Sequence, residues 1–211
     1  IPDCVYDWRK HKIPPRQLEA ADPLQFMLLD AADQALRDAG YDTALIGKSH
    51  LQNFTGHPAM SKPPPAREGY REPSAGLRKA MRIDLTGPEY GQEQPAYWAE
   101  PGAHIRAPFY GYGHVELVTG HGDAVDGDYR AWLKAKDPKA LGLLGPQNSL
   151  PHDYAVPQAY RTAIPEELYS TAYLGERAEA YLKARGKDAA PFFMTVSFPD
   201  PHHPFNPPGK Y

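Results

Sequence analysis

The sequence predicts an α/β fold with a mainly parallel sheet, and three observations carry that prediction. Helical apolar periodicity leads directly into a short apolar run at residues 24–47 and again at residues 165–198, and a third such run lies at residues 112–119. Helices that alternate with short apolar strands are typical of parallel sheets. The chain has 211 residues, with 24 prolines and 18 glycines, so we also expect extensive loops.

The first helix–strand unit is predicted from periodicity and from its end signals. Apolar residues at 24–39 recur on one face of a helix that begins after Asp22-Pro23 and stops at Gly40. Residues 41–47 (YDTALIG) then read as a strand. Residues 51–110 hold nine of the 24 prolines, and we expect them to form a loop-rich insertion that shapes a substrate site. Within it, residues 75–81 favour a short helix.

The second half of the chain predicts a strand and two helices before a last strand. Residues 112–119 alternate as a half-buried strand, and residues 126–135 favour a helix. Residues 165–185 predict a longer helix with an inner face at positions 168, 172, 175, 178 and 182. Residues 191–198 (PFFMTVSF) are almost continuously apolar, as in a buried parallel strand.

Composition excludes several classes of protein. The net charge is −3 without a basic stripe, so we expect neither a nucleic-acid nor an anionic-membrane binder. No apolar stretch approaches the ~18–20 residues of a transmembrane helix. Cys4 is the single cysteine, which excludes an internal disulfide and a cysteine-based zinc site.

Basic residues follow the first and the last predicted strands. Lys48 and His50 come directly after residues 41–47, and His202 and His203 follow residues 191–198. Open α/β sheets place ligands at the carboxyl ends of their strands. A lysine with several histidines suits a tetrahedral anion such as sulfate or phosphate, including its transfer transition state. The alternative is that these are separate surface residues.

Other candidates receive a structural interpretation. The residues around His121 (GHGD) favour a turn over a ligand site, and His114 is expected to be structural on its strand. Asp123, Asp126 and Asp128 have part of the spacing of a calcium loop. They lack the glycine and terminal glutamate of an EF-hand, so a solvated loop is expected.

Two blocks resemble the type I, formylglycine-dependent sulfatases. Residues 36–43 (LRDAGYDT) and 46–51 (IGKSHL) resemble the LRxAGYxT…GKxHL signature of that family, and residues 191–205 (PFFMTVSFPDPHHPF) resemble a second block. Residues 108–117, 120–123 and 165–181 are similar to intervening segments of some bacterial members. The resemblance implies an alkaline phosphatase-like α/β/α sandwich. It also implies hydrolysis of sulfate esters on a sulfated small molecule or glycan, with formylglycine and Ca²⁺ (or Mg²⁺).

The resemblance also implies roles for individual residues. Lys48 resembles the sulfate-binding lysine and His50 the histidine beside the formylglycine. His202, with His203 adjacent, resembles the histidine near the leaving-group oxygen. The family's nucleophile motif and metal ligands are absent, since Cys4 and residues 74–78 (SAGLR) do not fit. Residues 1–211 are therefore expected to be the central part of a sulfatase catalytic domain, inactive alone.

Two alternatives to a sulfatase fragment stay open. One is a phosphonate or phosphate monoester hydrolase of the same superfamily, and the other is a non-catalytic sulfatase-like module that binds glycans. The substrate, the oligomeric state and the cellular compartment are not predicted by the sequence.

Overall fold

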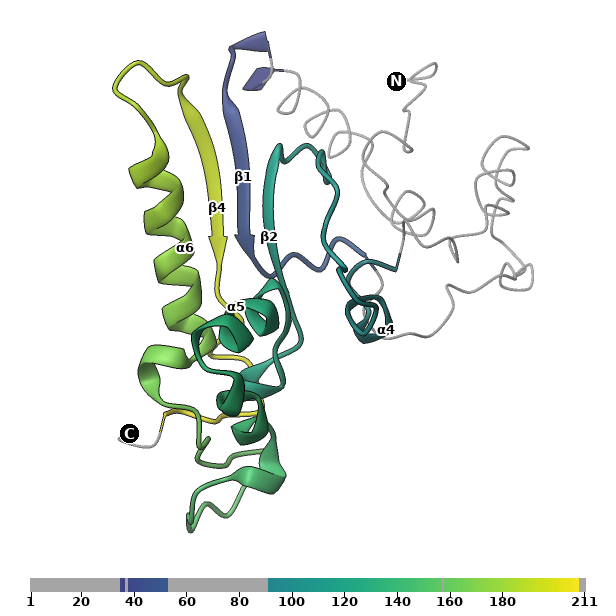
Figure 1. Cartoon of the computed structure of the whole chain (residues 1–211), viewed down its shortest axis with the longest axis vertical. Helices are drawn as coiled ribbons and strands as arrows, with labels where there is room; N and C mark the ends of the chain where they lie inside the picture. Colours follow the sequence, from purple (N-terminus) through teal and green to yellow (C-terminus); the bar gives the residue numbers. More distant parts are fainter. Residues whose placement is uncertain (1–34, 37, 53–90, 157, 209–211) are drawn as a thin grey trace, which may run out of the picture.

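The computed structural model describes residues 35–36, 38–52, 91–156 and 158–208 (Figure 1). Within these residues the chain is an α/β fold around a mixed four-stranded sheet. The strands are β1 (Asp42–Gly47), β2 (His114–Thr119), β3 (Asp126–Gly127) and β4 (Phe192–Ser197). The α-helices are α4 (Pro95–Trp98), α5 (Asp128–Lys136) and α6 (Ser170–Ala184). Short 3₁₀ turns occupy Gly122–Ala124, Pro138–Leu143, Pro146–Asn148 and Glu166–Leu168.

The three longer strands run in the same direction, so their carboxyl ends meet at one edge. The sheet order is β3-β2-β1-β4, with β1 parallel to both β2 and β4 and the short β3 antiparallel to β2. Gly47 at the end of β1 pairs with Leu117 and with Ser197, which aligns the three strand ends. Figure 1 shows the arrowheads of β4, β1 and β2 pointing toward the loops around α5.

Both faces of the sheet carry apolar side chains. Ile46 and Val118 point to the side covered by α5 and α6, where they join a core that includes Tyr129, Leu133 and Leu174. On the opposite face, a smaller core brings residues of β1 and β2 against the segment that precedes β2: Leu45, Leu117, Ile105 and Phe109. This alternation is what a sheet covered on two faces requires.

The strands predicted at 41–47 and 112–119 and the helix predicted at 126–135 are present in the structure. The strand predicted at 41–47 is β1, and Gly40 ends the preceding helix with a φ of +73°. The amide of Tyr41 donates to the carbonyl of Leu36 over 2.9 Å, as in a glycine-terminated helix. Residues 112–119 contain β2, and the helix predicted at 126–135 is α5. Most of the helix predicted at 24–39, and the one at 75–81, lie outside the described residues.

The helix and the strand predicted in the carboxyl-terminal half are present as α6 and β4, and Leu168 and Ala178 of the predicted inner face pack against the core. The start of the helix, the rest of its inner face and the burial of the strand are wrong. Helix α6 begins at Ser170 instead of 165, and its buried face centres on Tyr173 and Leu174, whereas Leu182 is exposed. Strand β4 is an edge strand of the described sheet, and Phe192 and Phe193 are 42% and 45% exposed. A continuous apolar run does not distinguish an edge strand from a central one, because burial depends on what lies beside the strand.

Candidate functional site

Three loops at the carboxyl edge of the sheet bring basic side chains together. Lys48 and His50 follow β1, His121 follows β2, and His202 and His203 follow β4. We call these five residues the basic cluster. The five residues come from three separate turns, so the cluster forms only when the three parallel strands are aligned.

His121 lies at the centre of the basic cluster. Its Nε2 contacts the Nζ of Lys48. Its ring stacks on that of His202 with centroids 3.7 Å apart and planes inclined by 20°. His50 approaches it edge-on at 6.1 Å, and His203 lies 6.5 Å away on the far side of His202. The ring centroids of His202 and His203 are 4.2 Å apart.

The turn that carries Lys48 and His50 is built around Gly47 and Glu93. Gly47 has a φ of +118°, and a Cβ there would lie 2.0 Å from the carbonyl oxygen of Ser197, so the close pairing of β1 and β4 requires glycine. Glu93, 2% exposed, accepts hydrogen bonds from the amides of His50, Leu51 and Gln52 and from the hydroxyl of Ser49. One buried carboxylate therefore fixes the whole turn.

His50 is held in an uncommon backbone conformation. Its φ is +58°, in the left-handed region that residues other than glycine rarely adopt. Its amide donates to Glu93 Oε2 over 2.9 Å, which stabilises that conformation. Non-glycine residues in this region cluster at functional sites, where the surrounding structure maintains the strain.

The cluster disfavours its own positive charge. Burial lowers the pKa of Lys48 to about 8, with the charge of Glu93 acting in the opposite direction. Burial, followed by the charges of Lys48 and His202, lowers the pKa of His121 to about 4. Burial and the Lys48 charge also lower the pKa of His50. At neutral pH Lys48 is thus mostly an ammonium that donates to the unprotonated Nε2 of a neutral His121.

The structure brings all four predicted residues into the basic cluster together with His121, and it shows that Glu93 holds the turn of Lys48 and His50. Lys48, His50, His202 and His203 lie around His121, for which the sequence favoured a simple turn. His121 lies between Gly120 and Gly122, which both have a positive φ. A histidine flanked by two glycines in the sequence is therefore the pattern that could have identified it. Glu93 had no recognisable signal, because it lies in a proline-rich segment far along the chain.

Asp123 and Asp128 are not the solvated loop residues that the sequence predicted. Asp123 is 1% exposed and accepts hydrogen bonds from Tyr160 and Thr162. Asp128, the first residue of α5, accepts a hydrogen bond from the amide of Leu117 in β2 over 2.7 Å. Asp126 is half-buried, 3.7 Å from Arg130. The spacing of the aspartates in the sequence does not predict these hydrogen-bond donors, because the donors come from distant parts of the chain.

The fold and the cluster define an α/β protein with a basic site at the carboxyl edge of its sheet. Among families, the model of the β-ketoacyl synthase N-terminal domain matches residues 6–82, about a third of the chain. Neither the curated proteins nor the solved structures include a match to this chain. Of the matched segment, residues 35–36 and 38–52 are described, which includes β1 and the turn with Lys48 and His50.

This match contradicts the sulfatase resemblance. It spans the whole first block, residues 36–51, on which that resemblance depended. Membership of the sulfatase family, hydrolysis of sulfate esters and the two alternatives within the same superfamily are therefore wrong. So is the expectation of formylglycine with Ca²⁺ or Mg²⁺. The alkaline phosphatase-like arrangement and a sulfated substrate have no support, and the general α/β class remains.

The sheet geometry explains why the first block was misleading. Gly47 is required by the contact with Ser197, and Gly40 by the end of the preceding helix. Both glycines are therefore needed by helix–strand geometry whatever the chemistry of the site. Among the described residues, no group of three or more His, Cys, Asp or Glu side chains is arranged to hold a metal ion. No described helix has both the length and the hydropathy of a membrane span.

Proposed function

We propose that the basic cluster binds the anionic group of a small substrate, a carboxylate or a phosphate, and that His121 exchanges a proton with it. The observation that carries this proposal is the convergence of one ammonium and four imidazoles at the ends of three parallel strands. Glu93 is the described carboxylate whose charge acts on Lys48 and His50, and its oxygens are engaged by backbone amides.

An anion would supply what the cluster lacks. Lys48 carries donors as an ammonium and His50 as an imidazole N–H, and burial lowers the pKa of both groups against the opposing charge of Glu93. A bound oxyanion accepts hydrogen bonds from such donors and offsets their mutual repulsion. The donors are already assembled by the turn that Glu93 holds, so little reorganisation accompanies binding.

His121 is a weak base in the ligand-free cluster, because burial and the charge of Lys48 lower its pKa to about 4. The negative charge of a bound anion would raise that pKa and so favour proton exchange between the ring and the substrate. The stacking of His202 on the same ring adds a second imidazole within reach of the same ligand. In this assignment Lys48 and His202 bind the anion with His203 beside them, and His50 and His121 complete the site.

The test is calorimetric titration of the purified protein with inorganic phosphate and, separately, with succinate at pH 7. The two probes distinguish a phosphate from a carboxylate preference. We expect K48M and H202Q to weaken binding of the preferred probe by about tenfold or more, the loss of a charge-assisted hydrogen bond. The matched controls K134M, at an exposed position of α5, and H152Q, in an exposed loop, should bind as the wild type does.

Two results would overturn the proposal. One is a wild-type protein that binds neither probe in the millimolar range. The other is equal weakening by K48M and K134M, because that would mean that only the net charge of the protein matters.

The family match over residues 6–82 favours a second candidate, a condensation between acyl thioesters. Such a reaction develops negative charge on a carbonyl oxygen, which the donors of the basic cluster would stabilise. Its test is release of free thiol from a simple and a carboxylated acyl thioester incubated together with the protein. Product that forms in the wild type and is lost in K48M supports the condensation, and its absence at millimolar thioester refutes it.

A further inference from the structure

A second set of side chains, away from the basic cluster, joins the loops that carry His121 and His202. Its first member is Asp123, two residues after His121 and 1% exposed. One carboxylate oxygen of Asp123 accepts from the hydroxyl of Tyr160, and the other accepts from Thr162 Oγ1 over 2.7 Å. A buried carboxylate needs such donors, since an unpaired one is costly to bury.

The hydrogen bonds continue from Tyr160 into the loop after β4. Asn206, 2% exposed, donates from Nδ2 to the Tyr160 hydroxyl over 3.1 Å. Its Oδ1 accepts from Tyr169 over 2.9 Å, and the same tyrosine hydroxyl lies 3.2 Å from Asp200 Oδ1. The set therefore includes residues two before His202 and three after His203.

Further contacts link the segment with Tyr160, and the loop with His121, to the loop after β4. The carbonyl of Phe205 accepts from the amide of Tyr160 over 3.0 Å, and the amide of Phe205 donates to the carbonyl of Gln158 over 2.7 Å. Gly122 packs so closely on Asn206 that a Cβ at Gly122 would lie 2.6 Å from its Oδ1. The loop with His121 therefore contacts the loop with His202 directly, through Gly122 and Asn206, and indirectly, through the segment with Tyr160.

We propose that Asp123 is a positioning residue that, through Tyr160 and Asn206, holds the rings of His121 and His202 in stacked contact. This inference rests on the proposed function, because it assigns a purpose to that contact. Side chains that gain positive charge on protonation repel one another, so a cluster of them does not stay assembled by its own interactions. The buried hydroxyls and the amide supply the missing constraint from outside the cluster.

The experiment removes one hydroxyl at a time. Y160F deletes the atom between Asp123 and Asn206 and keeps the ring, and T162V deletes the other donor to Asp123. T162S restores that donor, and Y154F on an exposed loop is the matched control. The readouts are the NMR titration of the His121 ring and the affinity for phosphate or succinate, in variants whose circular dichroism matches that of the wild type.

We expect Y160F to return the titration midpoint of His121 toward that of a free histidine, because the ring becomes less buried and moves away from the charge of Lys48. Anion affinity should fall by about three- to tenfold in Y160F and T162V, the worth of one hydrogen bond. T162S and Y154F should resemble the wild type. Well-folded Y160F with an unchanged His121 titration would overturn the positioning role.

The two proposals fail in different ways. If the wild type binds no anion but Y160F still shifts the His121 titration, the positioning role stands and the proposed function fails. If the wild type binds an anion and Y160F changes neither readout, the positioning role fails and the proposed function stands. Should Y160F not fold, the comparison of T162V with T162S gives the same decision.

Discussion

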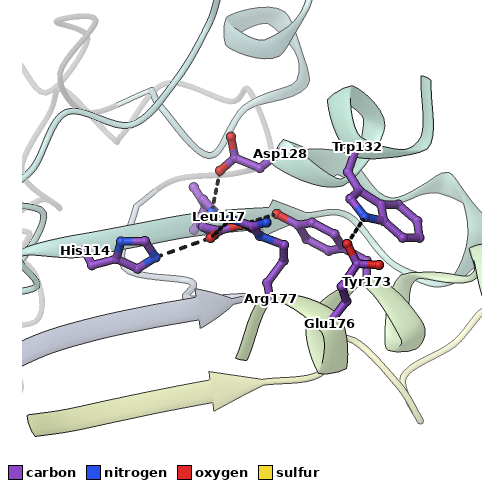
Figure 2. Close-up of polar contacts among 8 residues, drawn as sticks. His114, Leu117, Asp128, Trp132, Tyr173, Glu176 and Arg177 are labelled. Atoms are coloured by element: carbon purple, nitrogen blue, oxygen red, sulfur yellow. Dashed lines mark hydrogen bonds and ion pairs between the residues drawn. The ribbon is translucent and has the colours of Figure 1, made fainter. Parts of the chain in front are cut away.

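Two groups of ionisable side chains in this protein differ in how their charges are compensated. On the face between β2 and α6, Glu116 accepts two hydrogen bonds from the guanidinium of Arg177, at 2.5 and 2.7 Å, and one from Tyr173 at 3.0 Å. Figure 2 labels Arg177, Tyr173 and His114 around this carboxylate. His114 lies 3.3 Å from the same carboxylate without hydrogen-bond geometry. In the basic cluster, by contrast, Lys48 and four histidines face one another.

The pKa values of the two groups differ accordingly. Burial acts to raise the pKa of Glu116, but hydrogen bonds from Arg177 and Tyr173 outweigh it and hold that pKa below its ordinary value. For Lys48 and His121 burial lowers the pKa, and the like charges around His121 lower it further. The fold therefore favours the charged form around Glu116 and disfavours it in the basic cluster. We infer that the group around Glu116 stabilises the folded protein, whereas the basic cluster is the proposed anion-binding site.

The largest expected effect comes from breaking the compensated group. R177M leaves the carboxylate of Glu116 half-buried without its bidentate partner, and we expect a loss of about 2–3 kcal/mol in the free energy of unfolding. That is below the range for fully buried pairs, because the Arg177 side chain is 36% exposed. Urea denaturation followed by circular dichroism measures the loss.

The exposed Lys183–Glu179 pair on the same helix is the control for this prediction. K183M should change the free energy of unfolding by less than about 0.5 kcal/mol, as for most exposed pairs. A value for R177M as small as that for K183M would remove the distinction between the two groups.

The second prediction has the opposite sign. The pKa of Lys48 is lowered from 10.5 to about 8, so at pH 7 its charge is less favourable in the folded chain than in the unfolded one. K48M should therefore raise the urea midpoint of the ligand-free protein, while it weakens anion binding by about tenfold or more. The exposed-lysine variant K134M should leave the midpoint unchanged. A lower midpoint for K48M would show that Lys48 has a structural role.

The sequence predicted the strand ends well and the environment of the site poorly. Helix–strand periodicity located β1, β2 and β4, and the parallel order then implied that Lys48 and His202 share an edge. His121 was interpreted as a turn residue because its flanking glycines gave the stronger local signal. Glu93 and Asp123 depend on contacts across 30 or more positions, with the turn after β1 and with Tyr160 and Thr162, which no local pattern encodes.

The family resemblance failed for a related reason. The block around Gly47 is constrained by the close pairing of β1 with β4, and the amide of His202 donates to the carbonyl of Pro199 in the turn after β4. Such constraints are compatible with more than one function. The part of the prediction that came from residue chemistry at strand ends does not depend on that family. It survives as a proposal, whereas the reaction inferred from the resemblance was contradicted by the match over residues 6–82.

The third prediction concerns the pH dependence of anion binding. Because the pKa of Lys48 is about 8, its charge is lost as the pH rises from 7 to 9. Affinity for succinate, which stays fully ionised over this range, should fall by about tenfold between these pH values. Calorimetry at pH 7, 8 and 9 measures it. In K48M the affinity should be low and nearly constant, and an equal decline in that variant would assign the titration to another group.

The smallest effect tests whether the group around Glu116 is fully compensated. Asp128 lies beside it (Figure 2), and burial raises the pKa of its carboxyl from 3.8 to about 6, aided by the charge of Glu116 and opposed by the amide of Leu117. The folded protein thus retains a proton on Asp128 at a pH where the unfolded chain has lost it. The stability that this provides is present below pH 3.8 and is lost as the pH rises through about 6.

D128N removes the ionisation and keeps an oxygen that can accept from the amide of Leu117. At pH 7.5 it should increase the free energy of unfolding by about 0.5–1 kcal/mol over the wild type, and at pH 4 the difference should vanish. Asp126 forms an ion pair with the exposed side chain of Arg130, so the control variant D126N should show no such pH-dependent gain in stability. Destabilisation by D128N at pH 7.5 would mean that the carboxylate is needed as an anion, and the region around Glu116 would then resemble the basic cluster in requiring an opposite charge.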